Sequence, residues 1–209
     1  MAGITTHIVL SQKALSSFLP DKNKEEFIVG TSFPDIRYLN VVSREQTHLQ
    51  KVNLESIEHE PDSFTAGFRY HSLIDEARES FILKNNIYTI LPESPFITQA
   101  LKIYEDKVLL DKLSNRAGII RYFDNILPAE EEFAIPVVKL TKWHKLIQEW
   151  LSSPAEEPDV RLVLAALSFD KEQTKEITEL IHKIEDIPII KDITMRLYED
   201  LETILTVEA

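Results

Sequence analysis

Five side chains in the first 75 residues are of the types that bind divalent metal ions. Imidazole nitrogens and carboxylate oxygens are the ligands of zinc and related ions where thiolates are absent, and this chain has no cysteine. His71 and Asp75 are four residues apart in a stretch with helical periodicity, so both lie on one side of a helix, with Cβ atoms about 5–6 Å apart. The spacing would suit a metal site with this helix as its rigid platform. The candidate ligands are His7, Asp35, His48, His71 and Asp75.

Each candidate also has an ordinary structural interpretation. A single histidine in an amphipathic helix, such as His7, is usually a partly buried or surface residue. Asp35 follows a proline and can be a helix N-cap or a turn former. Asp75 can pair with Arg69 or with Arg78. Spacing alone does not decide between a metal site and these pairs.

The other histidines are not expected to bind metal. His59 lies among carboxylates before a helix start and is expected to be solvated. His144 follows a tryptophan on a helix that packs by its aromatic residues, which predicts a position at the edge of the core. His182 and Asp186 repeat the four-residue spacing, but no third ligand is near them in the sequence. We expect them to form a solvated face.

Helices must position these side chains, because most segments repeat apolar residues every three or four positions. Only four glycines occur, too few for a protein rich in β-hairpins. We expect an all-α fold of eight or nine helices in a single domain over residues 1–209, in which residues 1–90 carry the metal site and residues 91–209 complete the helical core. The expected helices cover 5–19 (capped by Thr5 or Thr6), 24–33, 61–84 (with Pro61 in its first turn), 97–114, 130–153 with a break near Pro136, 160–170, 171–186 and 190–206, while 43–52 is a loop that enters a helix.

Composition limits the classes of function. The formal charge is −12 and no basic cluster is present, so stable binding to nucleic acid or to an anionic membrane surface is not expected. No apolar run approaches the roughly 20 residues that span a bilayer. The first residues lack the pattern of a secretory signal, and we expect a cytoplasmic protein without disulfides or thiolate catalysis.

The order of four motifs is more specific than any one residue. The chain reads "TTH", then "GTSFPDIRY", then "REQTHL", then "FTAGFRYHSLID". This order resembles the bacterial zinc-dependent phospholipase C family, whose wider superfamily includes the single-strand-specific zinc nucleases. The resemblance covers roughly residues 3 to 80, and the stretch 64–75 is its most specific part.

The resemblance implies an all-α fold and a site for one or two zinc ions, or for manganese or another divalent metal. It implies that Asp35 is either a ligand or the catalytic carboxylate that orients the attacking water, and that Asp75 can bridge two ions. The metal ligands that it implies are His7, His48, His71 and Asp75, together with Asp35.

Two further residues take a role from the same resemblance. Arg44, one turn ahead of His48, is a candidate for holding a phosphate oxygen of the substrate. Gly67, one turn before His71, allows another helix to pack closely against the site. The expected substrate is a small phosphate ester, either a phospholipid head group or another phosphodiester or monoester.

The chain also departs from the family pattern. Secreted members use the N-terminal amine as a ligand, and here Ala2 would have to reach back to the site from His7. Those members build a third metal site from later residues, whereas here His144 and Glu149 are five apart and position 148 is glutamine. We expect a reduced site in a metal-dependent hydrolase of phosphoric esters. The alternative is a non-catalytic helical interaction protein with a degenerate or structural metal site.

Overall fold

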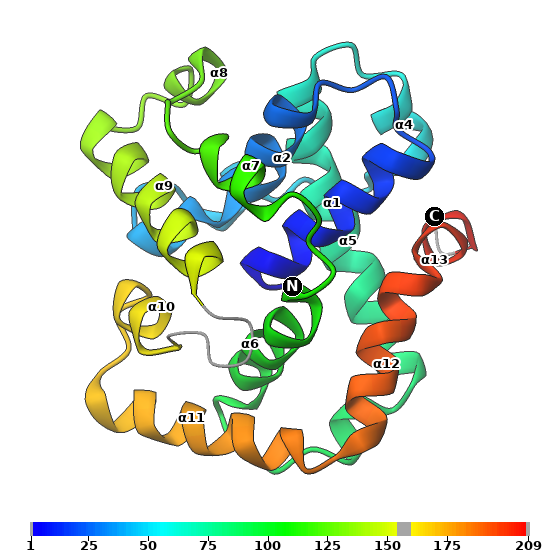
Figure 1. Cartoon of the computed structure of the whole chain (residues 1–209), viewed down its shortest axis with the longest axis vertical. Helices are drawn as coiled ribbons and strands as arrows, with labels where there is room; N and C mark the ends of the chain where they lie inside the picture. Colours follow the sequence, from blue (N-terminus) through cyan, green and yellow to red (C-terminus); the bar gives the residue numbers. More distant parts are fainter. Residues whose placement is uncertain (1, 154–159, 208–209) are drawn as a thin grey trace.

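The structure is a computed structural model that describes residues 2–153 and 160–207. Over these residues the chain is entirely helical, with no strand, which confirms the predicted all-α class (Figure 1). The early α-helices are α1 (Ile4–Ser17), α2 (Lys24–Ser32), α3 (Arg44–Thr47), α4 (Leu54–Glu58), α5 (Ser63–Lys84), α6 (Ile97–Leu110) and α7 (Arg116–Arg121). The later ones are α8 (Pro128–Glu131), α9 (Val137–Ser152), α10 (Val160–Ala166), α11 (Lys171–Glu185), α12 (Pro188–Glu199) and α13 (Leu201–Val207), and two 3₁₀-helices are η1 (Phe33–Leu39) and η2 (Ile87–Thr89).

The described part of the chain has thirteen α-helices, more than the eight or nine expected. Four of the additional ones, α3, α4, α7 and α8, have at most six residues, too few to give a clear helical period. The segment expected as one helix over 190–206 is two helices, α12 and α13, which are separated at Asp200. The expected break near Pro136 is present between α8 and α9.

Two predicted helix starts are wrong. Thr5 and Thr6 do not cap α1 but lie buried inside it, and Gly3 is the N-cap residue. Pro61 is not in the first turn of α5, because the helix begins after Asp62, whose side chain accepts a hydrogen bond from the backbone of Thr65. Aspartate is among the preferred N-cap residues, and this hydrogen bond fixes the start of the helix.

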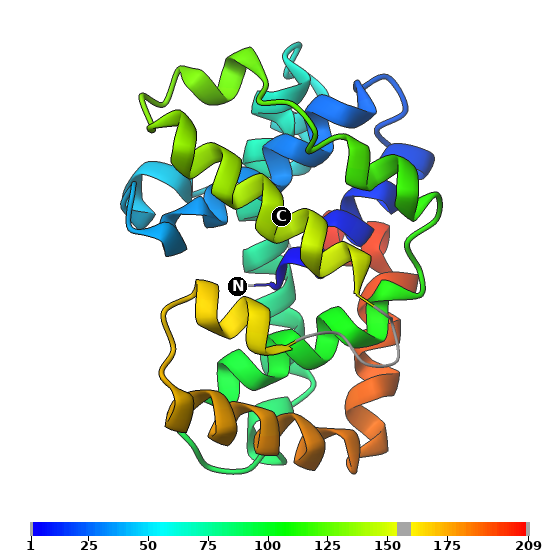
Figure 2. The same cartoon turned by 60° about the vertical axis from the view of Figure 1, so that its left-hand side comes forward.

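The buried apolar side chains form one continuous core. The long helix α5 is packed against α2 and α13, while α6 contacts α1, α11 and α12. The helices α11 and α12 run along one end and one side of the molecule in Figure 1. Helix α1 begins near the middle of the molecule in both views (Figure 2), so residues at its start are enclosed by later parts of the chain.

Among the described residues, no helix combines the length and the apolar character needed to cross a membrane.

Candidate metal centre

Helix α5 presents two of the candidate ligands to the interior. His71 is 0% exposed and Asp75 is 6% exposed. His71 Nε2 lies 3.8 Å from Asp75 Oδ2, so the four-residue spacing does bring the imidazole and the carboxylate together. Two polar side chains this deeply buried need partners or an ion.

Two glycines allow helix α2 to approach α5 closely enough to orient His71. A Cβ atom on Gly67 would lie 2.1 Å from the carbonyl oxygen of Phe27, and one on Gly30 would lie 2.2 Å from that of Phe64. Because the two backbones touch, Nδ1 of His71 can donate to the carbonyl oxygen of Thr31, 2.8 Å away. A carbonyl only accepts, so Nδ1 carries the proton and Nε2 keeps a lone pair directed at the site. The predicted role of Gly67 in close helix packing agrees with this geometry.

Helix α1 brings His7 to the same point. The imidazole is 1% exposed and stacks on that of His71, with ring centroids 3.8 Å apart and planes inclined by 14°. Its Nε2 lies 3.3 Å from Asp75 Oδ1. Later helices fix this part of α1: the backbone N and Oγ1 of Thr6 both donate to Asp106 of α6, each over 2.8 Å. Asp106 therefore caps the start of α1, a role that we expected of Thr5 or Thr6 in that helix.

Asp35 and His48 complete the cluster from the segment between α2 and α4. His48 follows the short helix α3 with an extended backbone, and its ring turns inward. Its Nε2 lies 3.4 Å from Asp75 Oδ2 and 3.3 Å from Nε2 of His71. Asp35 lies in η1 and is 4% exposed. The structure thus brings all five predicted ligands together.

The separations between these atoms suit a metal ion. Donor atoms of His7, His71 and Asp75 lie within 4.8 Å of one another, and so do those of Asp35, His48 and His71. Ligands bonded at 2.0–2.2 Å around a tetrahedral ion lie about 3.4 Å apart, close to the observed 3.3–3.8 Å. The two groups share His71, so they describe one centre.

Buried atoms without hydrogen bonds also point to a cation site. Within the described chain neither ring nitrogen of His7 makes a hydrogen bond, although Nε2 lies 3.3 Å from Asp75, and Oδ1 of Asp35 has only the guanidinium of Arg37, 3.4 Å away. A buried polar atom left in this state is costly, so each such atom in a native protein needs a reason. Coordination of a divalent ion supplies that reason for the imidazole and the carboxylate together.

The protonation states suit metal binding. Burial lowers the pKa of His71 well below its ordinary value, and neighbouring His7 and His48 add to this against the opposing effect of Asp75. Burial by itself raises the pKa of Asp75, but contacts with His48 and His7 outweigh it and hold that pKa well below its ordinary value. At neutral pH, His71 is neutral and Asp75 is ionised, and these are the forms that coordinate metals.

The alternative pairings do not occur. Arg69 pairs with Glu60 over 3.3 Å, and Arg78 makes a buried two-bond pair with Glu105, with both bonds at 2.9 Å. Neither arginine is therefore the partner of Asp75. Asp35 is not a helix N-cap either, since it is the third residue of η1.

The later histidines have ordinary roles. In His144, Nδ1 lies 3.1 Å from the carbonyl oxygen of Phe123 and Nε2 lies 2.8 Å from Oε1 of the fully buried Glu130. Both nitrogens are therefore occupied within the core. His182 is exposed and contacts Glu185, not the aspartate one residue further on. Neither histidine belongs to the described clusters of metal-binding type.

The chain matches no protein-family model, and no curated protein or solved structure is significantly similar to it. The function therefore has to be inferred from the site.

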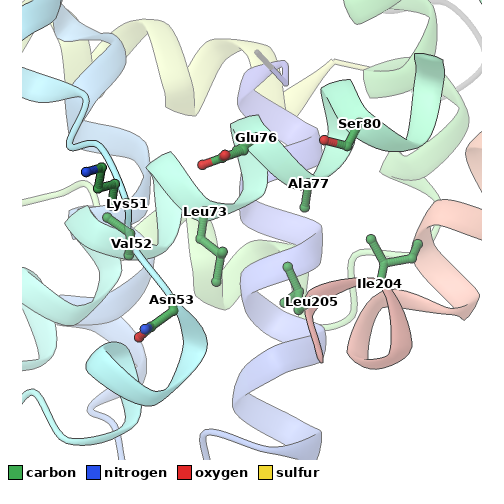
Figure 3. A pocket seen from close by; sticks show the side chains of 9 residues that line it. All are labelled: Lys51, Val52, Asn53, Leu73, Glu76, Ala77, Ser80, Ile204 and Leu205. Atoms are coloured by element: carbon green, nitrogen blue, oxygen red, sulfur yellow. The ribbon is translucent and has the colours of Figure 1, made fainter. Parts of the chain in front are cut away.

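A hollow of about 520 Å³ opens beside the cluster. His48 and Asp75 line it, and Arg44, the residue expected to hold a phosphate oxygen, lies exposed at the same hollow. A second hollow of about 260 Å³ adjoins it and shares Lys51, Glu76 and Ser80 with it. In Figure 3, apolar side chains from α5 and α13 gather in this second hollow: Leu73, Ala77, Ile204 and Leu205.

Sequence reasoning missed two features of the site. The backbone N of Ala2 donates to Asp75 Oδ1 over 2.6 Å, so the start of the chain does reach the cluster. Gly3 permits this approach, because a Cβ there would lie 2.4 Å from Asp106. Lys102 of α6 is 4% exposed and lies near Asp35. The available signal was a lysine between the two buried apolar residues Leu101 and Ile103.

Proposed function

We propose that this protein is a metal-dependent hydrolase of phosphoric esters. The observation that carries the proposal is the buried convergence of three imidazoles and two carboxylates beside a hollow with Arg44 at its edge. The nitrogen and oxygen donors suit zinc, with manganese as the main alternative. We infer one ion, because His71 has a single free nitrogen and both ligand groups require it. The order of motifs that resembles zinc-dependent phospholipase C supports the same chemistry.

In this proposal the residues of the site have three separate roles. His7, His48, His71 and Asp75 hold the ion, which when bound lowers the pKa of a water molecule and polarises a phosphoryl oxygen. Asp35 has a carboxylate oxygen without a hydrogen bond and can accept a proton from the attacking water. Arg44 binds a second phosphate oxygen at the edge of the hollow.

The adjoining hollow favours an ester with an apolar portion. Its lining is mainly aliphatic, and it meets the cluster's hollow along α5 (Figure 3). Leu49 and Leu83, which are 41% and 58% exposed, lie at the cluster's hollow. A phosphate at the cluster can therefore extend an apolar group over these surfaces. This arrangement suits a phospholipid or another amphiphilic phosphate ester.

The test combines metal analysis with hydrolysis. The purified protein is analysed by plasma mass spectrometry and then assayed on a chromogenic phosphodiester with added zinc or manganese. We expect about one ion per chain and hydrolysis that a chelator abolishes. His71→Ala should lose both the ion and the thermal stability that the ion provides, since only the folded chain assembles the ligands. His182→Ala, an exposed histidine outside the cluster, is the control, and an equal loss of metal in both variants would contradict the assignment.

A non-catalytic protein with a structural metal ion is the second candidate. It is favoured by the engagement of His144 with Glu130, which leaves the described later half without a further ligand. In that case the same preparation would contain metal but leave phosphomonoesters, phosphodiesters and phospholipids unchanged.

A further inference from the structure

Lys102 is buried without an ionic partner. It lies on α6 and is 4% exposed, yet within the described chain it makes no hydrogen bond and no ion pair. The described chain satisfies its other deeply buried cation differently, since Arg78 has two bonds to Glu105. A buried ammonium group is costly unless something compensates it. Lys102 therefore needs a partner that residues 2–153 and 160–207 do not provide.

The surroundings of Lys102 place it at the candidate metal centre. It lines a small cavity of about 30 Å³ together with Asp35 and Tyr38, which lie on η1. This volume is close to that of one water molecule, so it admits a single oxygen atom. Burial lowers the pKa of Lys102, and the negative charges of Asp35 and Asp75 act against this effect.

The charge balance identifies the kind of partner. With a divalent ion bound, the charges of Asp35 and Asp75 are offset, and two positive charges remain beside them: that of Lys102 and that of Arg37, whose guanidinium lies 3.4 Å from Asp35. Asp106 also lines the cavity and offsets one of these two charges, while its Oδ1 accepts from the backbone and the hydroxyl of Thr6. An anion that offers one oxygen to the cavity would restore neutrality.

We propose that Lys102 is an anion-binding residue that receives one phosphoryl oxygen in the cavity beside Asp35. The assignment rests on the proposed function, because it requires a bound ion at the cluster. It adds a cation at the buried end of the substrate's phosphate, whereas Arg44 is exposed. Lysine is suited to this task because its ammonium group is a compact donor for one oxygen.

The test measures the binding of inorganic phosphate, so it does not depend on turnover. Zinc-loaded protein, freed of excess zinc, is titrated with phosphate by calorimetry. In Lys102→Met the affinity should fall roughly 10- to 100-fold, the range for a hydrogen bond to a charged group, while zinc content stays unchanged. Methionine has a similar length and is apolar, so it suits a buried position. Lys107→Met, on the same helix but partly exposed and paired with Glu185, is the matched control and should bind phosphate normally.

The possible results separate this inference from the proposed function. Wild-type protein without bound metal would refute the proposed function and this inference with it. Metal binding with equal phosphate affinity in Lys102→Met and wild type, or with no phosphate binding at all, would overturn the inference alone. If Lys102→Met does not fold, NMR of the lysine ammonium groups in the wild type replaces it. One ammonium signal should then become protected from exchange when phosphate is added, and its absence would overturn the assignment.

Discussion

Replacing Gly67 with alanine tests how the fold orients the metal centre. The new Cβ would lie 2.1 Å from the carbonyl oxygen of Phe27, whereas ordinary contact begins at 3.4 Å, so α2 and α5 must separate by about 1.3 Å. The 2.8 Å hydrogen bond from His71 to the carbonyl of Thr31 would then lengthen to about 4 Å, beyond the limit for a hydrogen bond. The variant therefore disturbs the site without changing any ligand.

The magnitude follows from opposing effects. Overpacking costs about 1–3 kcal/mol and the lost hydrogen bond about 0.5–1.5 kcal/mol, while alanine regains about 1 kcal/mol of helix propensity. We expect a net loss of about 1–3 kcal/mol, which lowers the melting temperature by roughly 2–12 °C in a chain of this size. Because outer partners of metal-bound histidines affect affinity strongly, zinc binding should weaken by about 10- to 100-fold.

The assay is thermal unfolding together with competition for zinc against a chromogenic chelator. Gly118→Ala is the matched control, because the atoms its Cβ would meet belong to the flexible side chain of Asn115 and not to a backbone. It should keep wild-type zinc affinity. If Gly67→Ala melts and binds zinc like the wild type, the close helix contact does not orient His71.

Three other predictions follow from the same geometry. Asp35→Asn should keep most of the metal while turnover falls by about 10²–10⁴-fold, the usual range for a general base; if excess zinc restores the rate, Asp35 is mainly a ligand. His144→Gln should leave metal stoichiometry unchanged but lower stability by about 1–3 kcal/mol, because the buried carboxylate of Glu130 loses its partner; a loss of one ion would instead reveal a further metal site. Burial raises the pKa of Asp106 to about 6, so the folded state holds this proton up to that pH while the unfolded chain releases it near 4. As the pH rises from about 4 to 6, the free energy of unfolding of the wild type should therefore fall by about 3 kcal/mol relative to that of Asp106→Asn. Urea unfolding measures this difference, and parallel pH profiles of the two proteins would refute the prediction.

The long helices and the pairing of His71 with Asp75 could be predicted from the sequence for a common reason, whereas His7, Asp35 and His48 were added by residue type and by the order of motifs. Helical periodicity and fixed spacing are local properties, and His71 and Asp75 belong to a single uninterrupted helix. The short helices α3, α4, α7 and α8 could not be predicted, because a single turn is stabilised by its caps and neighbours and not by a repeating pattern.

Long-range contacts explain what else was missed. The start of α1 could not be placed from its own threonines, because its cap is supplied by Asp106, a hundred residues away from Thr6. The position of Ala2 beside Asp75 likewise depends on contacts across 73 residues. The burial of Lys102 depends on how η1 and α6 meet, and neither segment's pattern contains that information.

The anchoring of α1 by later helices has a consequence for synthesis on the ribosome. Oγ1 of Thr5 accepts a hydrogen bond from the indole of Trp150, which is 145 residues further along the chain. At about 5–20 residues per second, that tryptophan is made roughly 7–30 s after α1. During this interval α1 lacks the indole that holds Thr5, although Asp106, which holds Thr6, is made earlier. The anchoring of α1, and with it the position of His7, is therefore complete only after Trp150 has been made.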